Sequence, residues 1–81
     1  MECHFSVFPN PGTGKFTLNK PSFFDKVAMV TVYDLSGRLV LSKVLENGSR
    51  DLNVEELSNG RYLLQLQNQN HTAYTDFTIV K

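Results

Sequence analysis

The sequence has few of the residues from which catalytic and metal sites are built. Its 81 residues include one cysteine, two histidines and no tryptophan. A lone thiol, Cys3, cannot form an internal disulfide, and this count excludes zinc sites of four cysteines or of two cysteines and two histidines. His4 and His71 stand at opposite ends of the chain, and adjacent strand residues such as Cys3 and His4 point to opposite faces. The sequence therefore predicts no nucleophile–base pair and no enzyme.

Charge and hydrophobic runs are also limited. Eight basic and eight acidic residues give a formal net charge of zero, and the lysines and arginines are scattered along the chain. Capture of nucleic acid needs clustered positive charge, so we expect no nucleic-acid partner. No segment approaches the ~18 consecutive apolar residues of a membrane span, so we expect no membrane insertion.

Acidic residues are present without the spacing of a binding site. Asp25, Asp34 and Asp51 do not follow a calcium-loop pattern, and the adjacent acids Glu55 and Glu56 cannot converge on one point. We therefore expect neither a metal nor another cofactor.

Apolar residues recur mainly with a period of two, which is typical of half-buried strands. Short turns containing proline, glycine or asparagine separate the apolar segments. The predicted strands are 5–8, 15–19, 27–33, 38–45, 50–54, 61–67 and 71–80. In the last strand Tyr74 is out of phase with Phe77 and Ile79, which makes Asp76 a candidate position for a bulge.

Seven short strands without a useful helix predict an all-β, seven-stranded antiparallel sandwich of the immunoglobulin-like class. The side chains that share a strand face predict the core. They are Phe16, Leu18, Val30, Val32, Tyr62, Leu64, Leu66, Phe77 and Ile79.

A Leu-x-x-Gly-x-Tyr pattern enters the sixth strand at Leu57, Gly60 and Tyr62. This pattern resembles the tyrosine corner of Greek-key sandwiches, in which the phenol hydroxyl bonds to the backbone a few residues upstream. We therefore interpret Tyr62 as a structural residue, and a ligand-binding aromatic ring as the lesser alternative.

Three segments together resemble one family, the C-terminal sorting domain of the type IX (Por) secretion system, type A. FSVFPNPGTGKFTL resembles its opening motif, VTVYDLSGRLVLSK its central hairpin, and LSNGRYLLQL with the final FTIVK its closing motif. The motifs occur in the order and spacing of the family and cover nearly the whole chain, although the stretch 40–53 is less diagnostic. We expect one sorting domain over residues 3–81, with Met1 as an added start.

The resemblance implies that the domain is a sorting signal at the end of a larger secreted protein. The parent would enter the periplasm through an N-terminal signal, and an outer-membrane translocon would then recognise the folded domain. A surface sortase-like peptidase would remove it once the fused cargo has reached the cell surface or the extracellular space.

Exposed turns and the chain end are where a receptor is expected to bind such a domain. The candidate recognition residues are Pro9, Asn10, Pro11, Gly37, Arg38 and Lys81. Two explanations stay open for the presence of these prolines and glycines. Either the translocon contacts them, or the fold needs their backbone angles.

The competing hypothesis is an ancillary carbohydrate-binding or adhesive sandwich module. Such a module usually exposes aromatic rings on one face or in its loops. This sequence has no tryptophan and few loop aromatics besides Phe23 and Phe24.

Overall fold

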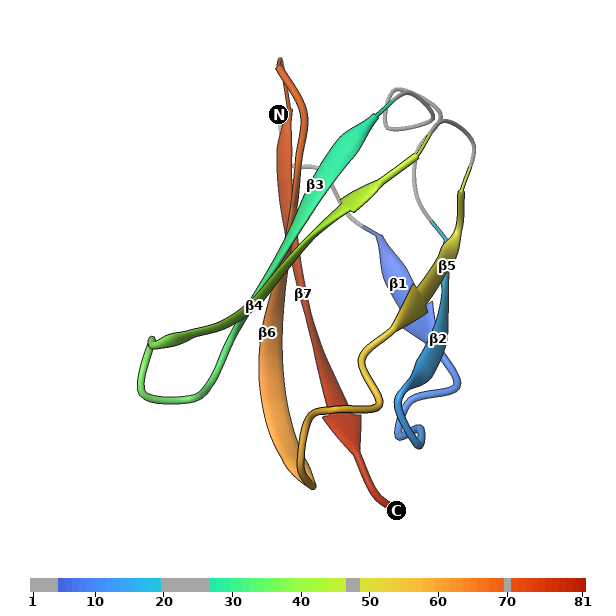
Figure 1. Cartoon of the computed structure of the whole chain (residues 1–81), viewed down its shortest axis with the longest axis vertical. Helices are drawn as coiled ribbons and strands as arrows, with labels where there is room; N and C mark the ends of the chain where they lie inside the picture. The colour runs from blue at the N-terminus through green and yellow to red at the C-terminus, as the bar shows by residue number, and fades with distance from the viewer. Residues whose placement is uncertain (1–4, 20–26, 47–48, 70) are drawn as a thin grey trace.

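A computed structural model of the chain describes residues 5–19, 27–46, 49–69 and 71–81. These residues form seven β-strands (Figure 1). The strands are β1 (Ser6–Phe8), β2 (Lys15–Asn19), β3 (Ala28–Tyr33), β4 (Leu39–Leu45), β5 (Asp51–Asn53), β6 (Gly60–Gln67) and β7 (Thr72–Ile79). In these four ranges there is no helix that is long and apolar enough to cross a membrane.

The strands divide between two sheets. The smaller sheet has the order β1-β2-β5, and the larger has the order β4-β3-β6-β7. All neighbouring strands within each sheet are antiparallel. Figure 1 shows the smaller sheet beside one face of the larger one. The predicted all-β, seven-stranded antiparallel architecture is confirmed, and its two layers are consistent with the immunoglobulin-like class.

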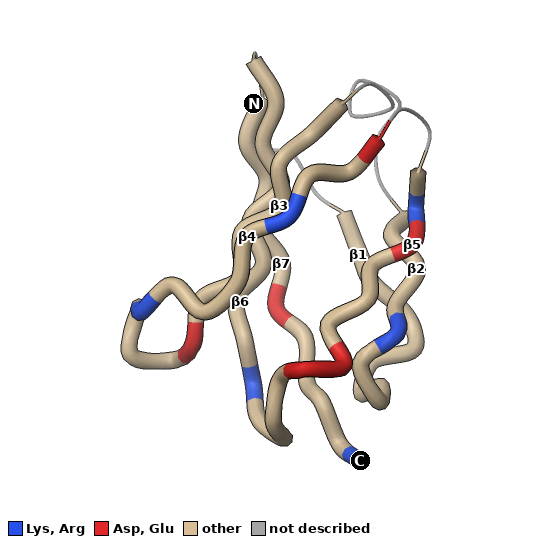
Figure 2. The backbone as a smooth tube through the Cα atoms, in the orientation of Figure 1, with Lys and Arg blue, Asp and Glu red and all other residues tan. Residues whose placement is uncertain are grey.

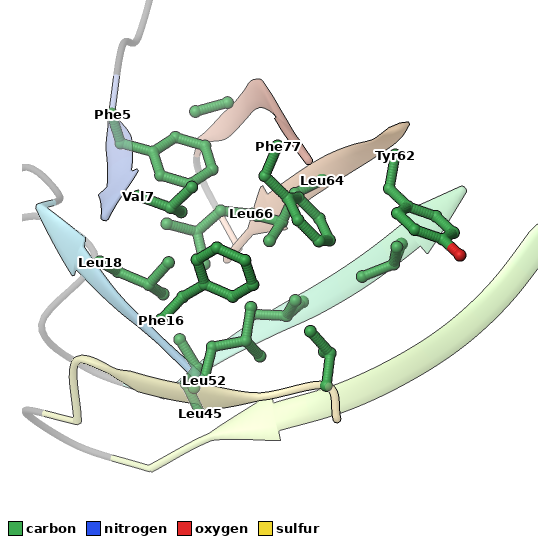
Figure 3. Close-up of a cluster of buried hydrophobic side chains, with 14 of the residues drawn as sticks. Phe5, Val7, Phe16, Leu18, Leu45, Leu52, Tyr62, Leu64, Leu66 and Phe77 are labelled. Atoms are coloured by element: carbon green, nitrogen blue, oxygen red, sulfur yellow. The ribbon is translucent and has the colours of Figure 1, made fainter. Parts of the chain in front are cut away.

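The core lies between the sheets and is built around three aromatic rings. The Phe77 ring of β7 packs edge-on against Phe16 of β2, with 5.0 Å between the ring centroids, and stacks on Tyr62 of β6 at 5.5 Å. Figure 3 shows these rings among the aliphatic side chains of both sheets. All nine residues of the predicted core are buried. Phe77 therefore joins the two layers directly.

Sequence analysis missed part of the core. The additional buried side chains are Phe5, Val7, Ala28, Leu45, Leu52, Val54, Leu57 and Ala73. Two of these, Val7 and Leu52, belong to β1 and β5, which have three residues each. A strand of three residues shows too little alternation for its buried face to be recognised from the sequence.

The proposed bulge near Asp76 is wrong. Pairing between β6 and β7 runs without interruption from Gly60 opposite Ile79 to Gln67 opposite Thr72. Tyr74 caused the apparent break in phase because it lies on the outer face of β7, where 54% of its surface is exposed.

The register shifts instead between β3 and β4. Val32 pairs with Leu41, but Tyr33 pairs with Leu39, so Val40 is an extra residue in β4. Val40 and Leu41 are both partly buried against the core. The extra residue lets two consecutive side chains pack there, which regular alternation does not allow.

The position of Phe77 leads to a stability prediction. Phe77→Ala should cost about 3–5 kcal/mol, as expected for a large side chain removed from a core. A domain of this size has only about 4–12 kcal/mol of stability, so the variant should lose a large part of its stability or unfold. Val80→Ala is the control because Val80 is 54% exposed, and it should change stability by less than about 0.5 kcal/mol. Urea unfolding followed by circular dichroism measures both, and equal midpoints would contradict the core assignment.

Candidate functional site

The loop between β1 and β2, residues 9–14, is called the first loop. Pro9, Asn10 and Pro11 are exposed in it, and the Asn10 side chain lies against β7. Asn10 Oδ1 accepts a hydrogen bond from the Thr78 amide at 3.0 Å, and its Nδ2 donates to the Asp76 carbonyl at 3.5 Å. β7 is an edge strand, so this side chain occupies backbone groups on the side of β7 away from β6.

Gly12 continues this contact through its backbone. Its amide donates to the Thr78 carbonyl at 3.0 Å, and its carbonyl accepts from the Val80 amide at 2.9 Å. These bonds form a parallel bridge between Gly12 and Ile79. We call the bonds of Asn10 and Gly12 to β7 the β7 clasp. The clasp connects the first loop of the smaller sheet to the last strand of the larger sheet.

Close packing at the clasp requires a glycine at position 12. A Cβ atom on Gly12 would lie 2.7 Å from Cε1 of Phe16 and 2.8 Å from the Pro9 carbonyl oxygen. The Phe8–Pro9 and Asn10–Pro11 peptide bonds in the same segment are both cis. The glycine at position 12 thus lets the first loop lie close to Phe16 and to β7.

Lys81 is anchored to a neighbouring loop. Its amide donates to Asn59 Oδ1 at 3.1 Å, and its Nζ donates to the Glu55 carbonyl at 2.7 Å. Both bonds are exposed to solvent, so each adds little to stability. They nevertheless place the ammonium group at a defined position beside the turn that follows β5.

The corner residues have structural contacts. Leu57 and Tyr62 are buried, and Gly60 takes a φ of 153° where β6 begins. The Tyr62 hydroxyl donates to the Ser58 carbonyl at 2.7 Å. This hydrogen bond is the one that the corner pattern predicts, and it fixes the segment that enters β6.

The turn between β3 and β4 is organised by one carboxylate. Asp34 Oδ1 accepts hydrogen bonds from the Ser36 amide at 3.0 Å, the Ser36 hydroxyl at 2.6 Å and the Arg38 amide at 3.0 Å. Gly37 takes a φ of 86°, a conformation that favours glycine. The Arg38 side chain is 79% exposed, and its Nε lies 3.3 Å from Asp34 Oδ2. The turn is therefore held in one shape while it stays open to solvent.

These hydrogen bonds also determine the ionisation of Asp34. The Ser36 hydroxyl is the largest influence and the Arg38 amide is the second, and together they hold the pKa of the carboxyl below its ordinary value of 3.8.

The candidate recognition residues lie in two places. Pro9 to Pro11 and Lys81 flank the end of β7, whereas Gly37 and Arg38 lie in the β3–β4 turn. Figure 1 shows this turn projecting away from the C-terminus. The residues therefore do not form one continuous site, and recognition of any of them by a receptor stays a prediction.

Sequence analysis missed a concave region beside the β3–β4 turn, which we call the hairpin hollow. It has a volume of about 510 Å³ and lies between that turn and the adjacent parts of β6 and β7. Its lining includes Tyr33, Leu35, Leu63, Arg61 and Asp76. Three separate segments contribute to it, so no local sequence pattern could have indicated it.

Several residues considered for chemistry lie outside the described ranges, namely Cys3, His4, Phe23, Phe24 and Asp25. Within those ranges no three histidine, cysteine, aspartate or glutamate side chains are grouped so that they could hold a metal ion. Glu55 and Glu56 lie near lysines of different strands. The distances are 4.0 Å from Lys15 Nζ to Glu55 Oε1 and 3.8 Å from Lys43 Nζ to Glu56 Oε2.

The corner hydrogen bond can be tested by removing one oxygen atom. Tyr62→Phe keeps the buried ring but removes the donor to Ser58, and should cost about 1 kcal/mol in the free energy of unfolding. Tyr74→Phe is the matched control because Tyr74 is 54% exposed, and it should change this energy by less than about 0.5 kcal/mol. Denaturant unfolding compares the two, and equal stabilities would show that the Tyr62 hydroxyl has no structural role.

The Asp34 contacts predict a pH dependence. A carboxyl with a lower pKa in the folded chain adds stability that is present above its unfolded pKa and disappears as the pH falls through the folded pKa. Asp34→Asn, which keeps the acceptor oxygen and removes the charge, should melt slightly below the wild type at neutral pH. This difference between the two melting temperatures should become smaller as the pH falls below 3.8. Melting curves across this range test it, and a gap that stays constant to about pH 2 would be the opposite result.

Comparison with known proteins identifies the chain. Residues 6–81 match the model of one protein family, described as the secretion system C-terminal sorting domain. No curated protein matches the sequence. The matched range contains the first loop, the β3–β4 turn, the corner and the end of β7, which are the features described above. The chain therefore belongs to the family of C-terminal sorting domains, which act as signals for type IX secretion and direct the proteins that carry them to the cell surface or the extracellular space.

Proposed function

We propose that this domain is recognised in its folded form by the outer-membrane translocon of the type IX system. In this proposal the parent protein enters the periplasm first, and residues 3–81 form the complete recognised unit. A surface sortase-like peptidase then removes the domain from the cargo fused to its N-terminal side. The observation that carries the proposal is the family match over residues 6–81, which also favours sorting over a carbohydrate-binding or adhesive role.

The contacts of β7 support recognition of a folded unit. Phe77 and Ile79 are 1% and 0% exposed, and the β7 clasp binds the same strand to the first loop. A chain without β7 would lose part of its core and would uncover β6 as a new sheet edge. The fold therefore makes the C-terminal residues necessary for the shape that a receptor would contact.

We further propose that the domain has no catalytic activity of its own. The family is one of sorting signals and not of enzymes. Ser36, an exposed hydroxyl residue of the β3–β4 turn, donates to Asp34 and so helps to hold that turn. This supports a structural role for the polar groups of the turn.

A secretion assay tests the sorting role. Residues 3–81 are fused to a carrier protein that has a Sec signal, in a bacterium with a type IX system, and carrier on the cell surface or in the medium is measured. We expect export of the fusion. A matched fusion without residues 75–81 should stay in the periplasm, because the domain should not fold. If the complete fusion is retained as well, the sorting proposal fails.

A Lys81 variant tests whether the translocon contacts the end of the chain. Lys81→Ala removes an exposed contact and should leave the melting temperature nearly unchanged. Lys15→Ala is the control, since Lys15 is also exposed and lies beside the same Glu55. A secretion defect in the Lys81 variant alone would mean that the translocon contacts this end. Normal secretion of both would show that the translocon does not need the Lys81 side chain.

A further inference from the structure

The first loop bonds to β7 in the way that a neighbouring strand would. The Gly12 amide donates to the Thr78 carbonyl, and the Gly12 carbonyl accepts from the Val80 amide. These two bonds lie on either side of Ile79, which is the pattern of a residue in a parallel strand. The backbone of Gly12 therefore acts as one residue of a strand that runs parallel to β7.

The Asn10 side chain continues this pattern two residues earlier. Its Oδ1 accepts from the Thr78 amide at 3.0 Å, and its Nδ2 donates to the Asp76 carbonyl at 3.5 Å. These bonds lie on either side of Phe77. A primary carboxamide offers a carbonyl oxygen and N–H donors, as a peptide group does. Positions 10 and 12 are thus opposite positions 77 and 79, with the same spacing of two residues on both segments.

The prolines of the first loop explain why a side chain takes this part. Pro9 and Pro11 have no backbone N–H. Donors to β7 from residues 9–12 can therefore come only from Asn10 and Gly12. Asn10 meets this requirement with its carboxamide, which replaces a peptide group at the edge of β7. We call the strand-like arrangement of Asn10 and Gly12 the pseudo-strand.

The pseudo-strand limits how much of the outer edge of β7 is open. The amide and the carbonyl of Thr78 both face it, away from β6. Residues that face outward alternate along an antiparallel strand, and the β6–β7 pairing has no break, so the backbone groups of Tyr74 and Asp76 face the same edge. Loss of the Asn10 carboxamide would extend the open part of the edge as far as the Thr78 amide.

An open edge of this length is a template for pairing with another chain. β7 has eight residues, Thr72–Ile79, and all of them except Ala73 and Asp76 are β-branched or aromatic, which favours strand pairing. The formal net charge of the chain is zero, so net charge does not keep two copies apart. A twofold axis would place two β7 edges of equal length antiparallel to each other. A second copy of the chain therefore fits the edge that the pseudo-strand covers.

We propose that the pseudo-strand keeps the domain monomeric by preventing β7 from pairing with β7 of a second copy. Asn10 contributes a surrogate peptide group, and without it the edge opens while the domain stays folded. The bonds of Gly12 and the core contacts of Phe77 do not involve Asn10 and would remain. This role concerns the domain in solution and does not depend on the sorting function.

Hydrogen exchange of the unaltered 81-residue chain tests whether the pseudo-strand is closed. The Thr78 and Val80 amides donate to it. The Tyr74 amide faces the same edge, and within the described ranges no backbone bond from outside β6 reaches it. After correction for intrinsic rates, Thr78 and Val80 should exchange about fivefold or more slowly than Tyr74, the factor of one net hydrogen bond. Equal exchange of the three amides would overturn the proposal.

An alanine variant at position 10 tests the carboxamide, and Asn59→Ala is the matched control. Asn10 and Asn59 are both exposed, and each accepts one backbone amide, from Thr78 at 3.0 Å and from Lys81 at 3.1 Å. Only Asn10→Ala opens the edge of β7. With rising protein concentration this variant should sediment as a dimer and keep the circular dichroism spectrum of the wild type. The wild type and Asn59→Ala should sediment as monomers.

Three results of this comparison would overturn the proposal. One is a folded Asn10→Ala variant that stays monomeric, and another is equal dimerisation of the Asn59 control or of the wild type. The third is loss of the native spectrum in Asn10→Ala, because Asn10 would then be needed for folding itself.

Hydrogen exchange of the Asn10→Ala dimer identifies the paired edge. The Tyr74 amide should exchange about fivefold or more slowly in the dimer than in the dilute monomer, because it would donate to the second copy. A dimer in which Tyr74 exchanges as it does in the monomer would be formed by another surface, and would contradict pairing through β7.

Discussion

The hydrogen bonds of the first loop to the outer edge of β7 are the constraint on which the structure depends most. The Asn10 side chain and the Gly12 backbone form hydrogen bonds to β7 on the side away from β6. Without them, amide and carbonyl groups of β7 would face solvent at an open sheet edge. The same bonds connect two sheets that share no strand. The chain's first turn and its last strand therefore depend on each other.

This dependence relates the fold to the position of a sorting domain at the end of a protein. β7 supplies Phe77, which contacts Phe16 in the smaller sheet and Tyr62 in the larger one. A protein that ends before Tyr74 lacks this ring, the clasp and the Lys81 contacts together. Folding of the domain therefore depends on the residues of β7.

The other edge of the larger sheet is stabilised in a different way. Lys43 of β4 donates to the Asn53 carbonyl at the end of β5 and lies 3.8 Å from Glu56 Oε2. A lysine on an edge strand also discourages pairing with other chains. Contacts thus join the two sheets at both edges of the larger sheet. Figure 2 shows that the charged groups of both signs are distributed along both sheets.

Sequence alone determined the strands, the turns and the part of the core that lies on the longer strands, because these follow from local alternation and from the backbone limits of proline and glycine. Val30 and Val32 are two residues apart and therefore share one buried strand face. Asp34 stands three residues before Gly37, which is the spacing of a turn that an aspartate side chain supports. Tertiary structure alone decided the rest. The partners of Asn10 and Lys81 lie 68 and 22 residues away, the extra residue Val40 depends on packing against the core, and the hairpin hollow is lined from three segments. Contacts of this kind depend on how two sheets meet, and no periodicity within one strand records that geometry.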